Sequence, residues 1–297
     1  MKTTMVYLFS GLGSLAILGF LLTGCSTVQD TIYMQGLNVS GPLNLPPIHA
    51  NNDSVGSKVS ISPHFAVKNG TTVDGTVDAN QYSLPGNNLH WNFPTSSFGV
   101  DLDARVSSAV AVSFGLNYAS AGQDGLLGGS GGLGFMFHGD NAMGRFELGL
   151  QFQTMRYDAS SVLEQTITPW YSSNSTTTVA YFHDIGTSTP LGYYGSLLIQ
   201  SKKLNSLFDI FGQLAVSHQG LSNFTPSTEV AYLGVMTYIR TDTRTGNSAT
   251  LFTLTPGVSF NLGAGTHLLG AVRIIKEIDF DADKFLFQPL VQFDIGL

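Results

Sequence analysis

The stretch from Phe285 to Leu297, FLFQPLVQFDIGL, alternates between two kinds of side chain. Every odd-numbered residue in it is apolar, whereas glutamine, aspartate and glycine lie among the even-numbered residues. Side chains two positions apart point to the same face of a β-strand. The stretch therefore predicts a strand with one wholly apolar face and one mixed face.

The same alternation recurs along most of the chain. Residues 145–153 place phenylalanine and leucine at even positions and arginine, glutamate and glutamine among the odd ones, and residues 98–105 alternate apolar residues with aspartate and arginine. We count about twelve such segments by this period-two criterion. They lie near residues 57–68, 96–106, 108–119, 131–138, 144–157, 176–185, 190–202, 205–218, 228–241, 249–262, 266–277 and 284–297.

The length of these segments favours a membrane. Most are about 10 to 14 residues long, whereas soluble strands run about 5 to 6 and tilted membrane strands about 9 to 11. Long two-faced strands can cross a bilayer only as a closed barrel, because every backbone polar group must be paired. We predict an all-β fold, an antiparallel transmembrane β-barrel of about twelve strands, or ten, over residues 57–297.

A soluble periplasmic β-sandwich is the alternative fold, since its strands also alternate. Its outward faces would need many charged side chains, but charged residues make up only 11% of the chain, with 13 Lys and Arg and 20 Asp and Glu. An ordinary soluble protein has roughly 25%. The net charge of -7 also argues against nucleic acid as a partner.

In a barrel the apolar faces contact lipid and the mixed faces line the interior. Paired charges of both signs could fill and lock a narrow lumen, or they could line a small passive channel for a polar solute. Both arrangements suit a barrel of this size, so the sequence leaves the choice open. The predicted lumen-lining residues are Asp101, Asp103, Arg105, Arg145, Glu147 and Gln151.

The N-terminus has the features of an export signal, with Lys2 followed by an apolar core and then the stretch FLLTGCST. Leu22 to Cys25 resembles the box at which bacterial lipoprotein signals are cut, and Cys25 is the only cysteine of the chain. The resemblance implies a signal peptide at 1–24, lipidation of Cys25 and handling by the lipoprotein-sorting machinery. Ser26 and Thr27, which follow, imply sorting to the outer membrane.

Residues 25–56 contain GPLNLPPIHANNDSVG and maintain no period. We interpret this region as the lipidated N-terminus followed by a flexible linker. An even number of barrel strands would bring both ends of the barrel domain to the periplasmic side, so that the lipid on Cys25 would enter the inner leaflet of the outer membrane.

The C-terminal segment resembles the last strand of bacterial outer-membrane barrels, whose apolar alternation is recognised by the barrel-insertion machinery. Phe293, Ile295 and Leu297 match this alternation, although Leu297 departs from the usual terminal aromatic residue. The resemblance covers an architecture, residues 57–297, and implies surrounding outer-membrane lipid as a partner. It names no specific family.

Catalytic motifs are weak. The stretch GGSGGLG, Gly128 to Gly134, formally matches a dinucleotide motif and a nucleophile elbow, but both need a following helix, so we expect a loop here. His218 and Ser222 suggest an alternative function as a lipid-modifying hydrolase barrel, yet nothing in their spacing secures a hydrogen bond between them. The seven histidines form no close pair. We expect a non-catalytic outer-membrane protein, either a narrow passive channel or a surface or structural component, without cofactor or metal.

Overall fold

A computed structural model describes residues 26–41, 43–50, 59–67, 72–75, 88–121, 124–169, 172–201, 207–233, 236–263, 265–279 and 285–297. The regular secondary structure of these ranges consists of strands, which confirms the all-β prediction. They contain no helix long and apolar enough to cross a membrane.

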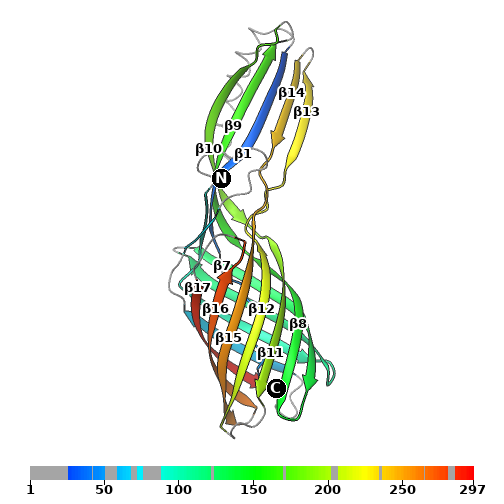
Figure 1. Ribbon diagram of the computed structural model, residues 1–297, viewed down its shortest axis with the longest axis vertical. Coiled ribbons are helices and arrows are strands. Elements are labelled where there is room, and N and C mark those ends of the chain that lie inside the picture. Colours follow the sequence, from blue (N-terminus) through cyan, green and yellow to red (C-terminus); the bar gives the residue numbers. More distant parts are fainter. Residues whose placement is uncertain are drawn as a thin grey trace.

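Ten of the strands in the described ranges close into an antiparallel barrel, which is completed by pairing of its last strand, β17, with its first, β2 (Figure 1). The closed barrel confirms the predicted fold class, at the lower of the two expected strand numbers. Its strands are β2 (Val59–Val67), β5 (Ser96–Arg105), β6 (Val110–Ala121), β7 (Asp124–His138), β8 (Ala142–Gln153), β11 (Leu191–Ser201), β12 (Phe208–Gly220), β15 (Ser248–Gly263), β16 (Thr266–Glu277) and β17 (Phe285–Gly296).

A second sheet stands on one end of the barrel (Figure 1). Its strands follow the order β10-β9-β1-β14-β13, and β4 pairs with the lower part of β1 and with β3. The seven strands that the structure describes in this sheet are β1 (Ser26–Ser40), β3 (Thr72–Gly75), β4 (Asn88–Asn92), β9 (Met155–Pro169), β10 (Thr176–Ser188), β13 (Ser227–Leu233) and β14 (Met236–Asp242).

The second sheet explains why about twelve barrel strands were predicted. The segments near 176–185 and 228–241 are strands, but they belong to the hairpins β9-β10 and β13-β14, which leave the barrel at its rim. A strand in water and a strand in lipid share the period of two, so periodicity alone does not separate them. The soluble sandwich is wrong, because the larger sheet closes on itself.

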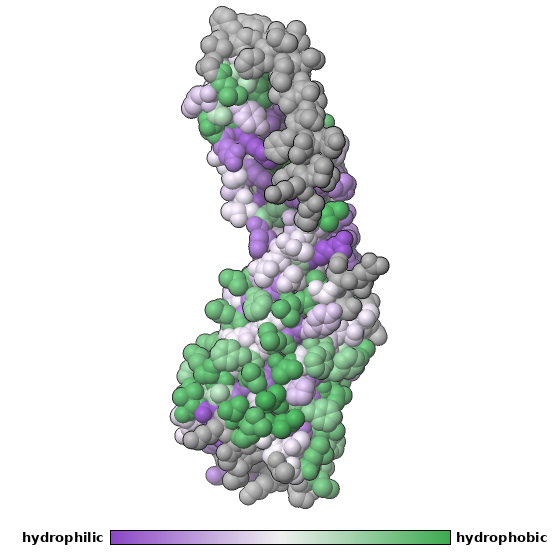
Figure 2. All heavy atoms as spheres, turned by 180° about the vertical axis from the view of Figure 1, so that it is seen from behind, coloured by the Kyte–Doolittle hydropathy of each residue, from purple (hydrophilic) through white to green (hydrophobic). Residues whose placement is uncertain are grey.

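The apolar faces of the barrel strands point outward and the mixed faces point inward, as predicted. In β17 the Phe285 side chain is 55% exposed and that of Gln292 is 1% exposed, and in β8 the corresponding values are 71% for Leu150 and 3% for Gln151. Figure 2 shows the hydrophobic side chains gathered over the barrel, with more hydrophilic ones over the sheet. The exterior of the barrel is therefore apolar and its interior is polar.

Residues 26–40 differ from the flexible linker predicted for 25–56. They form β1, a central strand that pairs with β9 on one side and with β14 and β4 on the other. A register shift between Met34 and Gly36 interrupts the alternation of buried side chains, so that Ile32 and Met34 precede it and Leu37 and Val39 follow it. This irregularity hides the strand period in the sequence. Residues 1–24 and Cys25 lie outside the described residues.

The two ends of the described chain lie at opposite ends of the molecule. Ser26 pairs with Pro169 at the end of the sheet far from the barrel, whereas Ser40 pairs with Arg156 near the barrel rim. Leu297 donates a backbone hydrogen bond to Val59 at the other mouth of the barrel (2.9 Å). Both ends of the barrel domain, Val59 and Leu297, therefore lie at the same mouth, as expected, whereas Ser26 does not lie on that side, where the lipid was expected.

Candidate functional site in the barrel lumen

The chain passes through its own barrel. Gly41 donates a hydrogen bond to the carbonyl of Asn92 at the sheet end (3.3 Å), and Val59 begins β2 at the opposite mouth. Between them, residues 44–50 are all buried. We call residues 43–50 the lumen segment.

The barrel wall holds the lumen segment through its backbone carbonyls. Pro46 and Pro47 have no N–H, so this part of the chain mainly needs donors, and a buried carbonyl without a donor is costly. Four inward side chains of the wall supply these donors. Gln219 donates to the carbonyl of Asn44, Arg273 Nη2 to that of Pro46 (3.1 Å), Gln213 Nε2 to that of Pro47 (2.8 Å) and Gln292 Nε2 to that of Ile48 (2.7 Å).

The side chain of Asn44 fixes the upper part of the lumen segment. Its amide donates to the carbonyls of Gly129 (2.9 Å) and Phe152 (3.1 Å), and its Oδ1 accepts from Asn117 Nδ2 (3.0 Å). These partners lie on β6, β7 and β8. Asn44 thus joins the segment to three neighbouring wall strands.

A group of paired charges lies beside the lumen segment. Arg145 Nη1 is 2.8 Å from Asp103 Oδ1, and its Nη2 is 2.6 Å from Glu147 Oε2. Tyr194 donates to Glu147 Oε1 (2.6 Å), and His49 Nε2 of the lumen segment is 3.9 Å from Glu147 Oε2. Pairing of this kind is what allows charged side chains to be buried. These contacts connect strands of the barrel wall to one another, and His49 connects them to the lumen segment.

The glycines of the GGSGGLG stretch make room for this group. The stretch lies within β7 and continues the barrel wall, so the loop expected for Gly128 to Gly134 is wrong. A Cβ atom at Gly132 would lie 2.5 Å from Tyr194 Oη and 2.7 Å from Glu147 Oε1. One at Gly134 would overlap the guanidinium of Arg145. Side chains here would displace the charged group from the lumen.

The structure places the residues predicted for the lumen as follows. Asp101, Asp103, Arg145, Glu147 and Gln151 are buried on the inner face, and Arg105 is half-buried at the mouth opposite the sheet. Sequence reasoning missed the residues that hold the lumen segment, because it treated that segment as a linker. For the residues of the wall, the signal available was the inward position of their side chains in period-two strands. These missed residues are Asn44, Asn117, Gln213, Gln219, Arg273 and Gln292.

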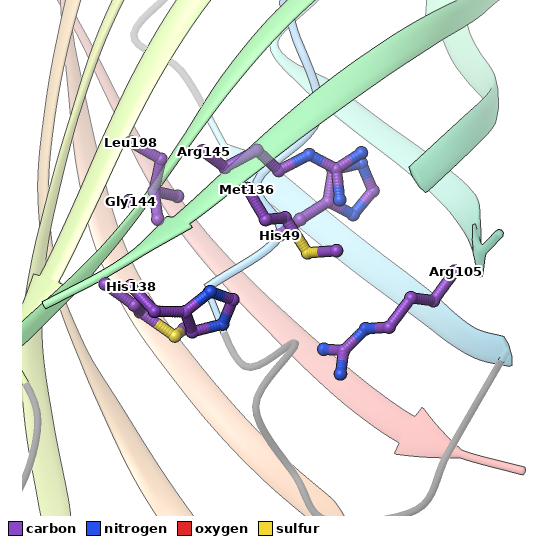
Figure 3. A pocket seen from close by; sticks show the side chains of 8 residues that line it. His49, Arg105, Met136, His138, Gly144, Arg145 and Leu198 are labelled. Atoms are coloured by element: carbon purple, nitrogen blue, oxygen red, sulfur yellow. The ribbon is translucent and has the colours of Figure 1, made fainter. Parts of the chain in front are cut away.

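Side chains occupy the described lumen toward both of its ends. At the mouth opposite the sheet, His49 lies close to Arg145 and Met136 (Figure 3), and the cavity that they line has room for about one water molecule. The sheet end is sealed by an apolar cluster that joins the two sheets. This cluster includes Leu37, Val39, Leu45, Trp91, Met155, Leu251, Ile275 and Leu286.

The barrel combines a closed sheet, an exterior of exposed apolar side chains and a polar, filled interior. In a membrane, strands of this kind pair all their backbone polar groups only when the sheet closes into a barrel, and their apolar outer face is suited to contact with lipid. The chain forms a β-barrel of the transmembrane type.

Comparisons with known proteins add little to this architecture. None of the protein-family models matches the chain, and no curated protein matches it. Similar solved structures include an outer-membrane channel from Pseudomonas putida F1, with TM-score 0.40 and 9% identity over 86% of this chain and 100% of that one. The translocator domain of the autotransporter NalP from Neisseria meningitidis has TM-score 0.34 and 12% identity, over 82% and 90%. The KdgM porin has TM-score 0.34 and 10% identity, over 80% and 99%. Likeness at this level carries no information on activity.

The barrel does not bring together the two residues named for a hydrolase. His218 Nδ1 lies 3.1 Å from Thr250 Oγ1, and the ring stacks on Tyr193 with centroids 5.0 Å apart. Ser222 Oγ instead accepts a hydrogen bond from the backbone N–H of Asn247 (3.2 Å). Each side chain thus has a partner of its own. Within the described residues there is no cluster of three or more His, Cys, Asp or Glu suited to a metal ion.

Proposed function

We propose that this protein is a non-catalytic surface component of the outer membrane, in which a closed barrel anchors and presents the second sheet. The occupied lumen supports this proposal. Donors from the barrel wall hydrogen-bond four backbone carbonyls of the lumen segment, those of Asn44, Pro46, Pro47 and Ile48. Paired charges fill the space beside the segment. A barrel built in this way serves as a base for the sheet better than as a passive channel.

The lengths of the connections favour an orientation with the sheet outside the cell. At the sheet end the barrel strands are joined across residues 68–95, 154–190 and 221–247, which contain six of the seven described strands of the second sheet. At the other end the connections are short, including 106–109 and 139–141. Outer-membrane barrels generally have short periplasmic turns and longer external loops.

Lipidation of Cys25 remains part of the proposal, but the barrel is the main anchor. β1 begins at Ser26 and runs the length of the sheet to the barrel, a span of about 45 Å at about 3.3 Å per residue. An acyl group on the preceding residue would therefore lie far from the bilayer around the barrel. We propose that surrounding lipid, the insertion machinery and the sorting machinery are the partners during assembly.

Conductance in planar lipid bilayers tests the closed lumen. We expect the wild-type barrel to insert without steady conductance. In the triple variant Gln213→Ala, Gln219→Ala and Gln292→Ala, three carbonyls of the lumen segment lose their donors, each at a cost of about 1 to 3 kcal/mol. The segment should then leave the lumen intermittently, which would appear as discrete conducting events.

Gln288→Ala is the matched control, because Gln288 is also a buried inward glutamine, but its hydrogen bond comes from Arg273 and not from the segment. It should remain as silent as wild type. Steady conductance of the wild-type protein would overturn the proposal and return the barrel to the class of passive channels.

A further inference from the structure

The second sheet has two long free edges. β10 pairs with β9 at one edge and β13 pairs with β14 at the other, and neither has a partner on its outer side among the described strands (Figure 1). A free edge presents a row of unpaired backbone N–H and C=O groups, which can pair with another chain. The closed barrel below has no such edges.

These edges carry few of the features that usually protect a strand from pairing. Protected edges carry charged side chains, especially lysine, or proline or a bulge. The sequences TTTVAYFHDIGTS of β10 and STEVAYL of β13 contain no lysine and no proline, and each has one acidic residue, Asp184 and Glu229. The pairing of each strand with its inner neighbour is continuous, without a bulge.

Both edges also carry the same apolar motif. Val-Ala-Tyr occurs at residues 179–181 and again at 230–232, and Tyr181 is 72% exposed and Tyr232 is 80% exposed. Tyrosine and valine are favoured in paired strands, where they pack against cross-strand neighbours. The motif on each edge is therefore suited to pairing with a further strand.

The directions and faces of the two edges are complementary. β10 runs in the same direction as β1, and β13 runs opposite to it. Val179 of β10 pairs with Glu164 of β9, which pairs with Thr31 of β1. Thr31 pairs with Thr241 of β14, which pairs with Thr228 of β13. Val179 and Thr228 therefore lie in one row across the sheet and on the same face. Two copies placed side by side would bring β10 of one against β13 of the other in antiparallel pairing.

Barrels inserted in one membrane have the same orientation, and this constraint favours pairing of β10 with β13. Antiparallel pairing of β10 with β10 in a continuous sheet would require one of the two barrels to be inverted. Pairing of β10 with β13 keeps both barrels upright and keeps equivalent faces of the two sheets on the same side. Complementarity under this constraint points to a second copy of the chain as the occupant.

We propose that copies of this protein associate head to tail in the plane of the membrane, through β10 of one copy and β13 of the next. The inference goes beyond the proposed function. It requires only that the barrels are inserted in one orientation, and not that the lumen is closed.

Disulfide cross-linking in intact membranes tests the contact. Val179→Cys is combined in turn with Thr228→Cys, Val230→Cys or Tyr232→Cys, which lie on the same face in successive registers. Four strand spacings separate the edges within one copy by about 19 Å, whereas a disulfide needs Cα atoms within about 7 Å. Cross-links between these positions must therefore join different copies. We expect a ladder of multimers for at least one register.

Two controls accompany the cross-linking. The protein without engineered cysteines reports any contribution of Cys25, and Val179→Cys with Ala231→Cys places the second thiol on the opposite face of the sheet. Both should give little cross-linking. Absence of multimers in all three test registers would overturn the proposal.

Lysine substitutions test the polarity of the contact. Tyr181→Lys should block the β10 edge and Tyr232→Lys the β13 edge, so each variant alone should be monomeric in detergent by light scattering. A mixture of the two should form dimers and no larger species, because one free β10 edge remains for one free β13 edge. Multimers of either variant alone, or a mixture that stays monomeric, would contradict head-to-tail association. A shift in gel mobility on boiling verifies that each variant is folded.

Discussion

Single glycines set the shape of the filled lumen, as Gly132 illustrates. Its missing side chain leaves room for Tyr194 and Glu147, which are buried and joined by a hydrogen bond of 2.6 Å. We predict that Gly132→Ala lowers the free energy of unfolding by about 1 to 3 kcal/mol, the usual effect of overpacking. The measurement is the temperature at which the folded band disappears from an unboiled denaturing gel.

Gly131→Ala is the control for this variant. Gly131 is adjacent in β7, but a Cβ atom there would lie 3.6 Å from the Phe114 ring, an ordinary contact. It should leave the unfolding temperature nearly unchanged. Equal destabilisation by both variants would mean that backbone effects dominate and that the room beside Tyr194 is not needed.

In the second sheet a tyrosine provides a pH probe. Burial and then the hydrogen bond from Tyr238 Oη to Asp30 Oδ2 (2.6 Å) raise the pKa of Tyr238 to about 12. Because the folded pKa lies above the unfolded value of about 10, this group's contribution to stability is complete below about pH 10 and is lost as the pH rises through about 12. The difference in tyrosinate absorbance between wild type and Tyr238→Phe should titrate with a midpoint near 12.

Asp30→Asn separates the two causes of this shift. Removal of the carboxylate charge should lower the midpoint, but the pKa should stay above its usual value because burial is the larger cause. A wild-type midpoint near 10 would show that Tyr238 has neither the burial nor the contact with Asp30 that the structure gives it.

At the scale of elements, Arg244 connects strands that are not neighbours in the sheet. Its guanidinium pairs with Asp242 at the end of β14 (2.7 Å), lies 3.6 Å from Asp184 of β10 and covers the Phe224 ring at 4.7 Å. We predict that Arg244→Ala increases cleavage of the second sheet by a nonspecific protease several-fold and leaves the heat-dependent gel shift of the barrel intact. Arg240→Ala, on the exposed part of β14, should leave the cleavage rate unchanged. A loss of the gel shift in Arg244→Ala would mean that the barrel depends on this contact.

The strands themselves could be predicted from the sequence, but their assignment to two sheets could not. Alternation in β8 and β17 identified strands and their faces, because lipid and the lumen select opposite side chains. The alternation of β10 is equally regular, although both of its faces are in water beyond the rim. The lumen segment has no period at all, since its partners are side chains of the wall on strands that are remote in sequence. Its prolines, read as marks of a linker, fit a segment that receives hydrogen bonds from the wall.

At the scale of the whole molecule, the apolar exterior of the barrel is sufficient as a membrane anchor, and the proposed acyl group on Cys25 is not needed for it. We predict that Cys25→Ala remains in the outer-membrane fraction and keeps its gel shift on boiling. Mass spectrometry of the N-terminal peptide should detect acylation in wild type alone. Release of Cys25→Ala into the periplasm would mean that the apolar exterior of the barrel does not suffice to hold the protein.

The threaded lumen also fixes which parts of the chain share a side of the membrane. Residues 172–175 connect β9 to β10 at the tip of the sheet, whereas Leu297 lies beside Val59 at the opposite mouth. An epitope inserted between Asn174 and Ser175 should bind antibody on intact cells, and an epitope after Leu297 should bind only after the outer membrane is permeabilised. A third epitope, in the short 106–109 connection, should behave like the C-terminal one. The reverse pattern would place the sheet in the periplasm, and labelling of all three epitopes on intact cells would contradict a barrel that spans the membrane with its two mouths on opposite sides.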